Sequence, residues 1–323
     1  MSKQIRNVTV KTLTLGTPET IVLPRNYALR QLLLRLKGTV DVTAGTTAFT
    51  QLSQGVANLL SNIRVRRDGK DTMFALGGQL TYELNKILYG TPNAITLAAI
   101  TNATNVAVNA TMIVPFENIR GVNPFDTLLK GAGLSSLDLL IDTVAASNMF
   151  YGGDGTVAVN SAFTLSVDVM EEVGANNFIF GDIRTYLAQK IAVTAASNNF
   201  QIKPISVGNF YKGFLLFVED AGVPSDSVIT NIKLKSGSEV FIDIPAADLK
   251  DDNKRHFGIT TLSTGVYYID LMPDGRLNQC LDVTPASGRE SLEFELVTAA
   301  PGGTCNISVV ALEYIPPQVV VKK

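Results

Sequence analysis

The alternation of apolar and polar residues along the chain is mainly that of short β-strands. Residues 162–170 (AFTLSVDVM) and 304–314 (TCNISVVALEY) change between apolar and polar at almost every position, as strands with one buried face do. Residues 62–66 and 72–76 flank an Asp-Gly pair that favours a tight turn, so we expect a β-hairpin there. Residues 29–37 (LRQLLLRLK) fit either a strand or a helix by their periodicity.

Only a few segments have a helical pattern. Apolar residues share one helical face between Gly77 and Gly90, and these are Leu80, Leu84, Ile87 and Leu88. A second helix is predicted from 184 to 191, with Asp182 as its N-cap, and a shorter one within 49–60. Residues 91–111, rich in Thr, Asn and Ala, are expected to form an exposed loop, or a loop with an edge strand.

The chain contains an internal repeat. Residues 59–65 (LLSNIRV) and 228–234 (VITNIKL) pair like with like at a constant offset of 169. Each segment is followed by a turn with Gly, an apolar return strand and a predicted helix, which ends at Gly90 in one copy and Gly258 in the other. Later strands recur in the same order. This order predicts two copies of one antiparallel unit, a sandwich or jelly roll of roughly eight strands.

These observations predict a mainly β fold, with two tandem eight-stranded antiparallel jelly rolls and a few short helices. We expect a first jelly roll with an N-terminal arm at 1–175, a linker with a helix at 176–200, and a second jelly roll with a C-terminal arm at 201–323. Pro316-Pro317 followed by Gln-Val-Val-Val indicates an extended C-terminal arm that could add a strand to a neighbour's sheet.

The amino-acid composition excludes several classes of function. The 323 residues carry a net charge of −2, which excludes a globally basic nucleic-acid binder, and we expect no sequence-specific nucleic-acid partner. There is a single histidine, His256, within the charged run DDNKRHFG, which we expect to be a surface loop. One histidine excludes most metal centres and catalytic triads. Cys280 and Cys305 are expected to be small buried residues without a disulfide framework. We therefore expect no catalytic residues, no cofactor and no enzymatic activity.

Adjacent acidic residues occur at Glu171-Glu172 and at Asp251-Asp252. Neighbours on a strand point to opposite faces, so neither pair makes one site by itself, and we interpret both as solvated charge. A structural Ca²⁺ ion at an interface between copies stays open. The sequence Gly152-Gly153-Asp154-Gly155 is predicted to be a hairpin turn.

Basic residues are the candidates for contact with partners. Lys3, Arg6 and Lys11 make the N-terminal arm basic, and Lys322 and Lys323 lie at the other end. Arg64 and Arg66 share one face of their predicted strand. These seven side chains could meet an acidic partner, packaged nucleic acid or lipid headgroups. For Arg64 and Arg66, the alternative is a charged edge strand that blocks unwanted pairing.

The layout of two matched jelly rolls, each with a helix after a hairpin, resembles the double jelly-roll major capsid proteins of adenovirus and of tailless phages with an internal membrane. Residues 59–90 carry most of the resemblance, with contributions from 29–38 and 121–146. It implies a viral structural protein, with pseudo-hexameric homotrimers that tile an icosahedral shell over an internal lipid membrane. The implied partners are other copies of the chain, penton and minor capsid proteins, and membrane lipids.

The same resemblance implies that the chain resides in the virion capsid. The N-terminus lacks the apolar region of a secretory signal, so we expect assembly in the cytoplasm of a bacterial host. Deletion of residues 1–12 is expected to spare the trimer but to impair particle assembly. A double jelly-roll glycan-binding protein or glycoamidase is the alternative, although the chain has no Trp to form a sugar platform. Another particle protein, such as a spike, is a third hypothesis.

Overall fold

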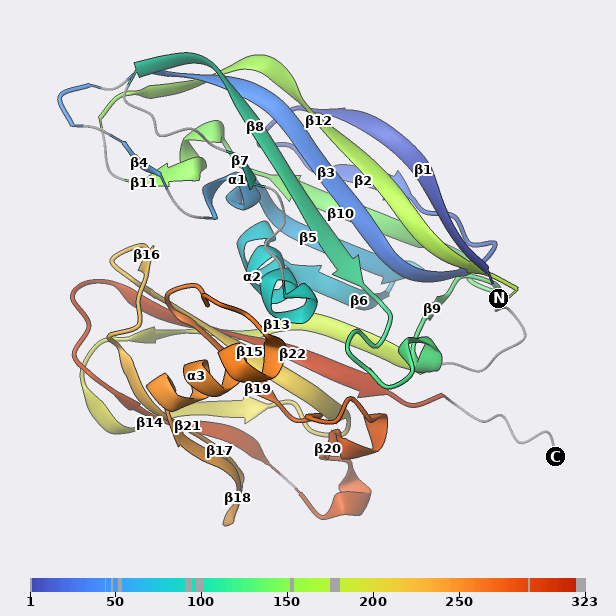
Figure 1. Ribbon diagram of the computed structural model, residues 1–323, viewed down its shortest axis with the longest axis vertical. Helices are drawn as coiled ribbons and strands as arrows, with labels where there is room; N and C mark the ends of the chain where they lie inside the picture. The colour runs from blue at the N-terminus through green and yellow to red at the C-terminus, as the bar shows by residue number, and fades with distance from the viewer. Residues whose placement is uncertain are drawn as a thin grey trace. The chain divides into compact units, whose positions relative to one another are not determined.

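The computed structural model describes residues 2–43, 45–47, 49–51, 54–90, 95–96, 102–151, 154–174, 181–289 and 291–317. Within them the chain is mainly β and divides into two compact units (Figure 1). Unit 1 takes most of the chain up to Ile183. Unit 2 takes Arg184–Pro316 together with the short excursion Arg120–Asn123.

Unit 1 is built from two antiparallel sheets that enclose a core. The first sheet has the order β1 (Ser2–Leu13), β12 (Thr156–Val173), β3 (Ala28–Thr43), β8 (Asn102–Pro115) and β7 (Ile95–Thr96), with β9 (Leu129–Lys130) also paired with β3. In the second, the order is β6 (Asp71–Leu76), β5 (Leu60–Arg67), β10 (Leu137–Thr143) and β2 (Glu19–Val22). A short pair joins β4 (Thr50–Gln51) to β11 (Phe150–Tyr151). The ambiguous apolar segment is a strand because Leu32, Leu34 and Leu36 alternate into the core, each fully buried.

Unit 2 repeats this plan. One sheet contains β13 (Asp182–Val193), β22 (Cys305–Ile315) and β15 (Phe210–Asp220), and the short strands β16 (Val223–Pro224), β19 (Val266–Asp270) and β20 (Leu281–Asp282) each pair with β15. The other sheet has the order β14 (Ser197–Ile205), β21 (Leu292–Thr298), β17 (Ile229–Ser236) and β18 (Glu239–Pro245). Its core includes Phe214 and Phe294, which meet edge to face at 5.3 Å between ring centroids.

The internal repeat is confirmed element by element. The hairpin β5–β6 leads into helix α2 (Gly78–Tyr89), and the hairpin β17–β18 leads into helix α3 (Ala246–Phe257). Both helices end at a glycine in the left-handed conformation, Gly90 with φ 72° and Gly258 with φ 64°. A further helix, α1 (Gly55–Asn58), is a single turn within the segment predicted to contain a short helix. The remaining turns are 3₁₀: η1 (Pro124–Asp126), η2 (Ala146–Met149), η3 (Leu277–Gln279) and η4 (Pro285–Ser287).

Two sequence-based predictions of local structure are wrong, and a third holds in part. The predicted helix at 184–191 is part of strand β13, and the Asp182 carboxylate accepts a hydrogen bond from Arg67 instead of capping a helix. The predicted N-terminal arm is strand β1, which pairs with β12 from Ser2 to Leu13. For 91–111 the alternative of a loop with an edge strand holds in part: β7 at Ile95–Thr96 ends the sheet as far as the structure describes it, whereas residues 102–111 belong to the long strand β8, which pairs with β3. Of the segments predicted above, residues 91–94, 97–101, 152–153, 175–180 and everything after 317 lie outside the described residues.

Candidate functional site

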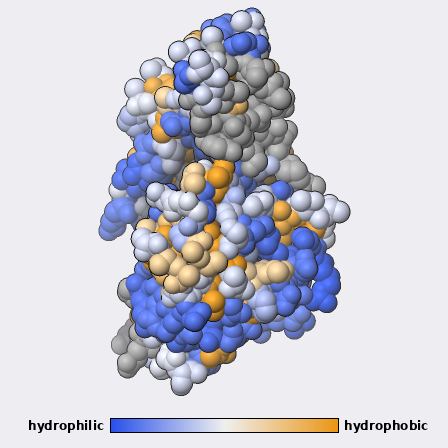
Figure 2. Space-filling view, turned by 90° about the vertical axis from the view of Figure 1, so that its left-hand side faces the viewer, coloured by the Kyte–Doolittle hydropathy of each residue, from blue (hydrophilic) through white to orange (hydrophobic). Residues whose placement is uncertain are grey.

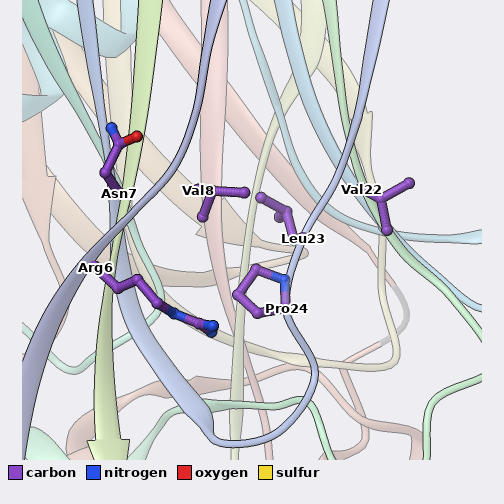
Figure 3. Close-up of a pocket in the computed structure, with 6 residues that line it drawn as sticks. All are labelled: Arg6, Asn7, Val8, Val22, Leu23 and Pro24. Carbon is purple, nitrogen blue, oxygen red and sulfur yellow. The ribbon is translucent and has the colours of Figure 1, made fainter.

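The two sheets of unit 1 leave a hollow between their end strands, β1 and β2. A cavity of about 310 Å³ lies there, lined by Arg6, Asn7 and Val8 on one side and by Val22, Leu23 and Pro24 on the other (Figure 3). Arg6 Nη2 donates to both carboxylate oxygens of the fully buried Glu171, at 3.0 and 3.1 Å. Arg6 therefore neutralises a buried acid at this edge of the unit.

The other predicted basic residues differ in how they are engaged. Lys11 Nζ lies 3.6 Å from Glu19 Oε2, a half-exposed and weak pair. Lys3 is exposed on β1 and has no ion-pair partner among the described residues. Lys322 and Lys323 lie outside the described residues.

Arg64 and Arg66 do lie on one strand, but β5 is an interior strand. It pairs with β6 on one side and β10 on the other, so the alternative of a charged edge strand is wrong. Arg64 Nη2 is 3.1 Å from Asp142 Oδ2, on the neighbouring strand. Arg66 stands opposite Asp138, and its Nε is buried with no hydrogen-bond acceptor among the described residues.

Two charged clusters were not predicted from sequence. In unit 1, Arg30 contacts Glu117 at 2.6 Å and Glu172 at 3.5 Å, and all three side chains are largely buried. In unit 2, a ladder of ion pairs crosses strands β14, β21, β17 and β18, made by Lys203, Lys233, Lys235, Asp243, Glu293 and Glu295. The alternation Lys233/Lys235 and Glu293/Glu295 was the sequence signal for the ladder, because residues two apart share a strand face.

The residues that could support covalent catalysis are poorly placed for it. His256 lies in the last turn of α3, not in a loop, and its Nε2 is 3.3 Å from Asp270 Oδ2. Cys280 and Cys305 are both free and buried. Burial raises the pKa of each thiol to about 11, so neither is a thiolate at neutral pH.

No group of three potential ligands gathers for a metal ion within the described residues. The interpretation of the adjacent acids as solvated charge is wrong for Glu171 and Glu172, which are buried, and is confirmed for Asp251 and Asp252, whose side chains are exposed. All four acids pair with basic side chains. Glu171 pairs with Arg6 and Glu172 with Arg30, whereas Asp251 and Asp252 pair with Lys254 and Arg255 along α3. Among the helices that the structure describes, none is long and apolar enough to cross a bilayer.

The face drawn in Figure 2 shows hydrophilic surface interrupted by patches of apolar residues. Among the described residues, Ile5 and Val10 on β1 and Val22 on β2 are exposed apolar side chains, and Val22 lines the hollow.

Comparison with known proteins gives one family match and several structural matches. Residues 183–315 match the family of the viral coat protein P2 C-terminal domain. No curated protein sequence matches the chain significantly.

Solved structures share the fold of the whole chain. The major capsid protein of Sulfolobus turreted icosahedral virus is 18% identical, with a TM-score of 0.78 over 100% of both chains. The major capsid protein P2 of bacteriophage PM2 is 14% identical, with a TM-score of 0.65 over 100% of both chains. The mavirus major capsid protein is 10% identical, with a TM-score of 0.54, and the match covers 95% of this chain and 86% of that one. Residues 183–315 thus match a viral coat protein family, and the chain as a whole has the double jelly-roll fold seen in viral major capsid proteins.

Proposed function

We propose that the chain is the major capsid protein of a virus and that three copies form a pseudo-hexameric trimer that tiles an icosahedral shell. The observation that carries the proposal is the duplication itself: one chain holds two units with the same strand order, hairpin and helix. Three copies therefore supply six similar units. Repetition of a few symmetric contacts is how soluble assemblies close. The coat-protein family match to unit 2 favours this function over glycan binding or a spike.

Further partners follow from the geometry of such a shell. Six-cornered tiles alone cannot close an icosahedron, so the fivefold positions need a penton protein, and minor proteins would seal the joints. We place assembly in the cytoplasm of a bacterial host, with the finished protein in the virion capsid.

An internal membrane is the third part of the proposal. Lys3 is exposed, and Lys322 and Lys323 add two more cations in the sequence. Each cation near an anionic bilayer contributes about 1 kcal/mol, and many copies in a lattice would add these contributions. Cosedimentation of the full chain with phosphatidylglycerol vesicles, but not with phosphatidylcholine vesicles, is the expected result.

The mass of the purified protein in solution tests the assembly. Light scattering after gel filtration should give three times the chain mass of 34.6 kDa, or a shell-sized particle visible by electron microscopy. A monomer that persists at high concentration would overturn the proposed function.

A further inference from the structure

Each unit has an end strand that exposes apolar side chains at the rim of a sheet. In the part of the chain that the structure describes, β1 ends its sheet in unit 1 and β18 ends its sheet in unit 2 (Figure 1). Ile5 and Val10 on β1 are 55% and 62% exposed, and Val240 on β18 is 49% exposed. An open edge with exposed branched residues is a template for pairing with another chain.

The register of β1 places its apolar residues on one face. Ile5 pairs with Met170, and Val10 pairs with Ser166. Ile5 and Val10 are five residues apart on β1, but their partners are four apart on β12, because the register of the ladder shifts between Asn7 and Thr9. The β12 residues between these partners that point into the core, Val167 and Val169, are fully buried. Ile5 and Val10 therefore share the outer face of the sheet, and Lys3, two residues before Ile5, lies on it too.

Strand β18 presents the matching arrangement. Ile242 and Ile244 stand opposite the buried residues Leu234 and Ile232, so they face the core. Val240 and Asp243 stand opposite Lys235 and Lys233, which belong to the outer ladder of ion pairs. The outer face of β18 thus carries one exposed valine and one carboxylate next to the open edge.

The charges of the two strands are opposite. Residues 2–13 contain Lys3, Arg6 and Lys11 and no acid, whereas residues 239–245 contain Glu239 and Asp243 and no base. Both acids have partners in their own unit, Arg289 and Lys233, yet their side chains stay 51% and 49% exposed. Pairing β1 with β1, or β18 with β18, would bring like charges together, while pairing β1 with β18 brings opposite charges together.

We propose that β1 of one copy pairs with β18 of a second copy and so extends a sheet across the interface between copies. This proposal rests on the self-assembly proposed above and names the surface that mediates it. The contact joins two different surfaces, so it is head-to-tail. Such contacts close into a ring when the rotation permits, and a ring of three copies satisfies both edges of every chain.

Cross-linking tests which strands meet. Ile5→Cys and Val240→Cys variants are prepared separately, mixed and treated with a short bismaleimide, whose span tolerates a register error of about two residues at roughly 3.3 Å each. The native Cys280 and Cys305 are buried. A product of twice the 34.6 kDa chain mass is expected from the mixture but not from either variant alone. Val207→Cys, which replaces a valine exposed to 45%, is the matched partner of Ile5→Cys that should not cross-link.

Charge substitution gives a second readout on the same surface. Lys3→Gln should raise the trimer dissociation constant several-fold, and Lys3→Arg, which keeps the charge, should leave it unchanged; Lys3→Glu is avoided because it would stand opposite Glu172 of its own chain. Two results together would overturn this contact and leave the coat function standing. The trimers would form normally, and Ile5→Cys would cross-link to Val207→Cys as well as to Val240→Cys. A chain that stays monomeric in every mixture would overturn both.

Discussion

At the scale of single residues, the buried Lys212 makes the stability of the fold depend on pH. It lies on β15 where the ladder with β22 shifts register, and its side chain is buried. Burial lowers the pKa of Lys212 from 10.5 to about 8, although the nearby Asp270 opposes the change. The unfolded chain then binds a proton more readily than the folded chain. The free energy of unfolding should rise as the pH rises from about 8 to about 10.5. Below about pH 8, the buried charge of Lys212 lowers the free energy of unfolding by on the order of 3 kcal/mol.

Replacement of Lys212 by Met keeps the length of the side chain and removes the charge. We expect Lys212→Met to raise the free energy of unfolding at pH 7 by up to about 3 kcal/mol, and by much less near pH 10.5, where the native lysine is mostly neutral. Urea unfolding at the two pH values measures the difference. Lys37→Met, on the exposed side of β3, is the control, since it should change little at either pH. Equal effects of Lys212→Met at both pH values would contradict the assignment.

The buried cation Arg30 is held by two acids from distant parts of the chain. Its guanidinium meets Glu117 and Glu172, which are 8% and 2% exposed as residues. Arg30→Met would leave two carboxylates without their cation, and we expect a loss of about 3–5 kcal/mol in unfolding free energy. Arg276→Met, at an exposed arginine, should cost less than about 0.5 kcal/mol. A small effect of Arg30→Met in urea titrations would show that water reaches these acids.

At the scale of elements, the two helices are tied to their sheets in equivalent ways. Asn85 of α2 accepts a hydrogen bond from the Ile113 backbone N–H at 2.7 Å and donates one to the Ile113 carbonyl at 2.8 Å. Asn253 of α3 donates to the Tyr268 carbonyl at 2.8 Å. Both amides are buried and lie in the same turn of their helices. The repeat thus extends to a specific polar contact between helix and strand.

Removal of these amides should cost stability in proportion to the bonds lost. Asn85→Ala leaves a buried N–H and a buried carbonyl without their partner and should cost about 2–3 kcal/mol, whereas Asn253→Ala should cost about 1–2 kcal/mol. Chemical denaturation of the two variants gives the comparison. Asn85→Asp retains the acceptor but loses the donor, so its loss of stability reports the donated hydrogen bond separately from the accepted one. A larger loss from Asn253→Ala would show that packing, not hydrogen bonding, dominates.

Local signals explain which elements the sequence could predict. Helix α2 follows from four apolar residues on one face and a terminal glycine, and the hairpins follow from their turns. Strand β13 does not, because Leu187 and Ile191 are four apart and Ala, Gln and Lys between them favour a helix. Pairing within the sheet overrides that local preference. The Arg30 cluster was also hidden, because its three residues come from segments that only the fold brings together.

At the scale of the whole molecule, the N-terminal segment is part of the fold and not a free arm. A free basic arm could be removed without harm to the fold. Strand β1 instead completes the first sheet of unit 1, and Arg6 neutralises the buried Glu171. Its outer edge is also the surface that we propose for contact with a second copy.

Deletion of residues 1–12 should therefore destabilise the chain as well as prevent its assembly. Without β1, the edge of β12 is opened and Glu171 stays buried without its cation, which is strongly unfavourable. We expect the thermal midpoint of the deletion variant to fall by at least about 5 °C, since a loss of 1 kcal/mol lowers it by about 2–4 °C in domains of 150–250 residues. Calorimetry measures the midpoint, and light scattering measures the mass. Lys3→Gln is the matched comparison, because it removes the proposed contact with β18 without adding an acid opposite Glu172, so the trimer should weaken while the midpoint of the monomer stays unchanged. If the deletion variant kept its midpoint and still formed trimers, residues 1–12 would be the free arm that the sequence predicted, which the trimer does not need.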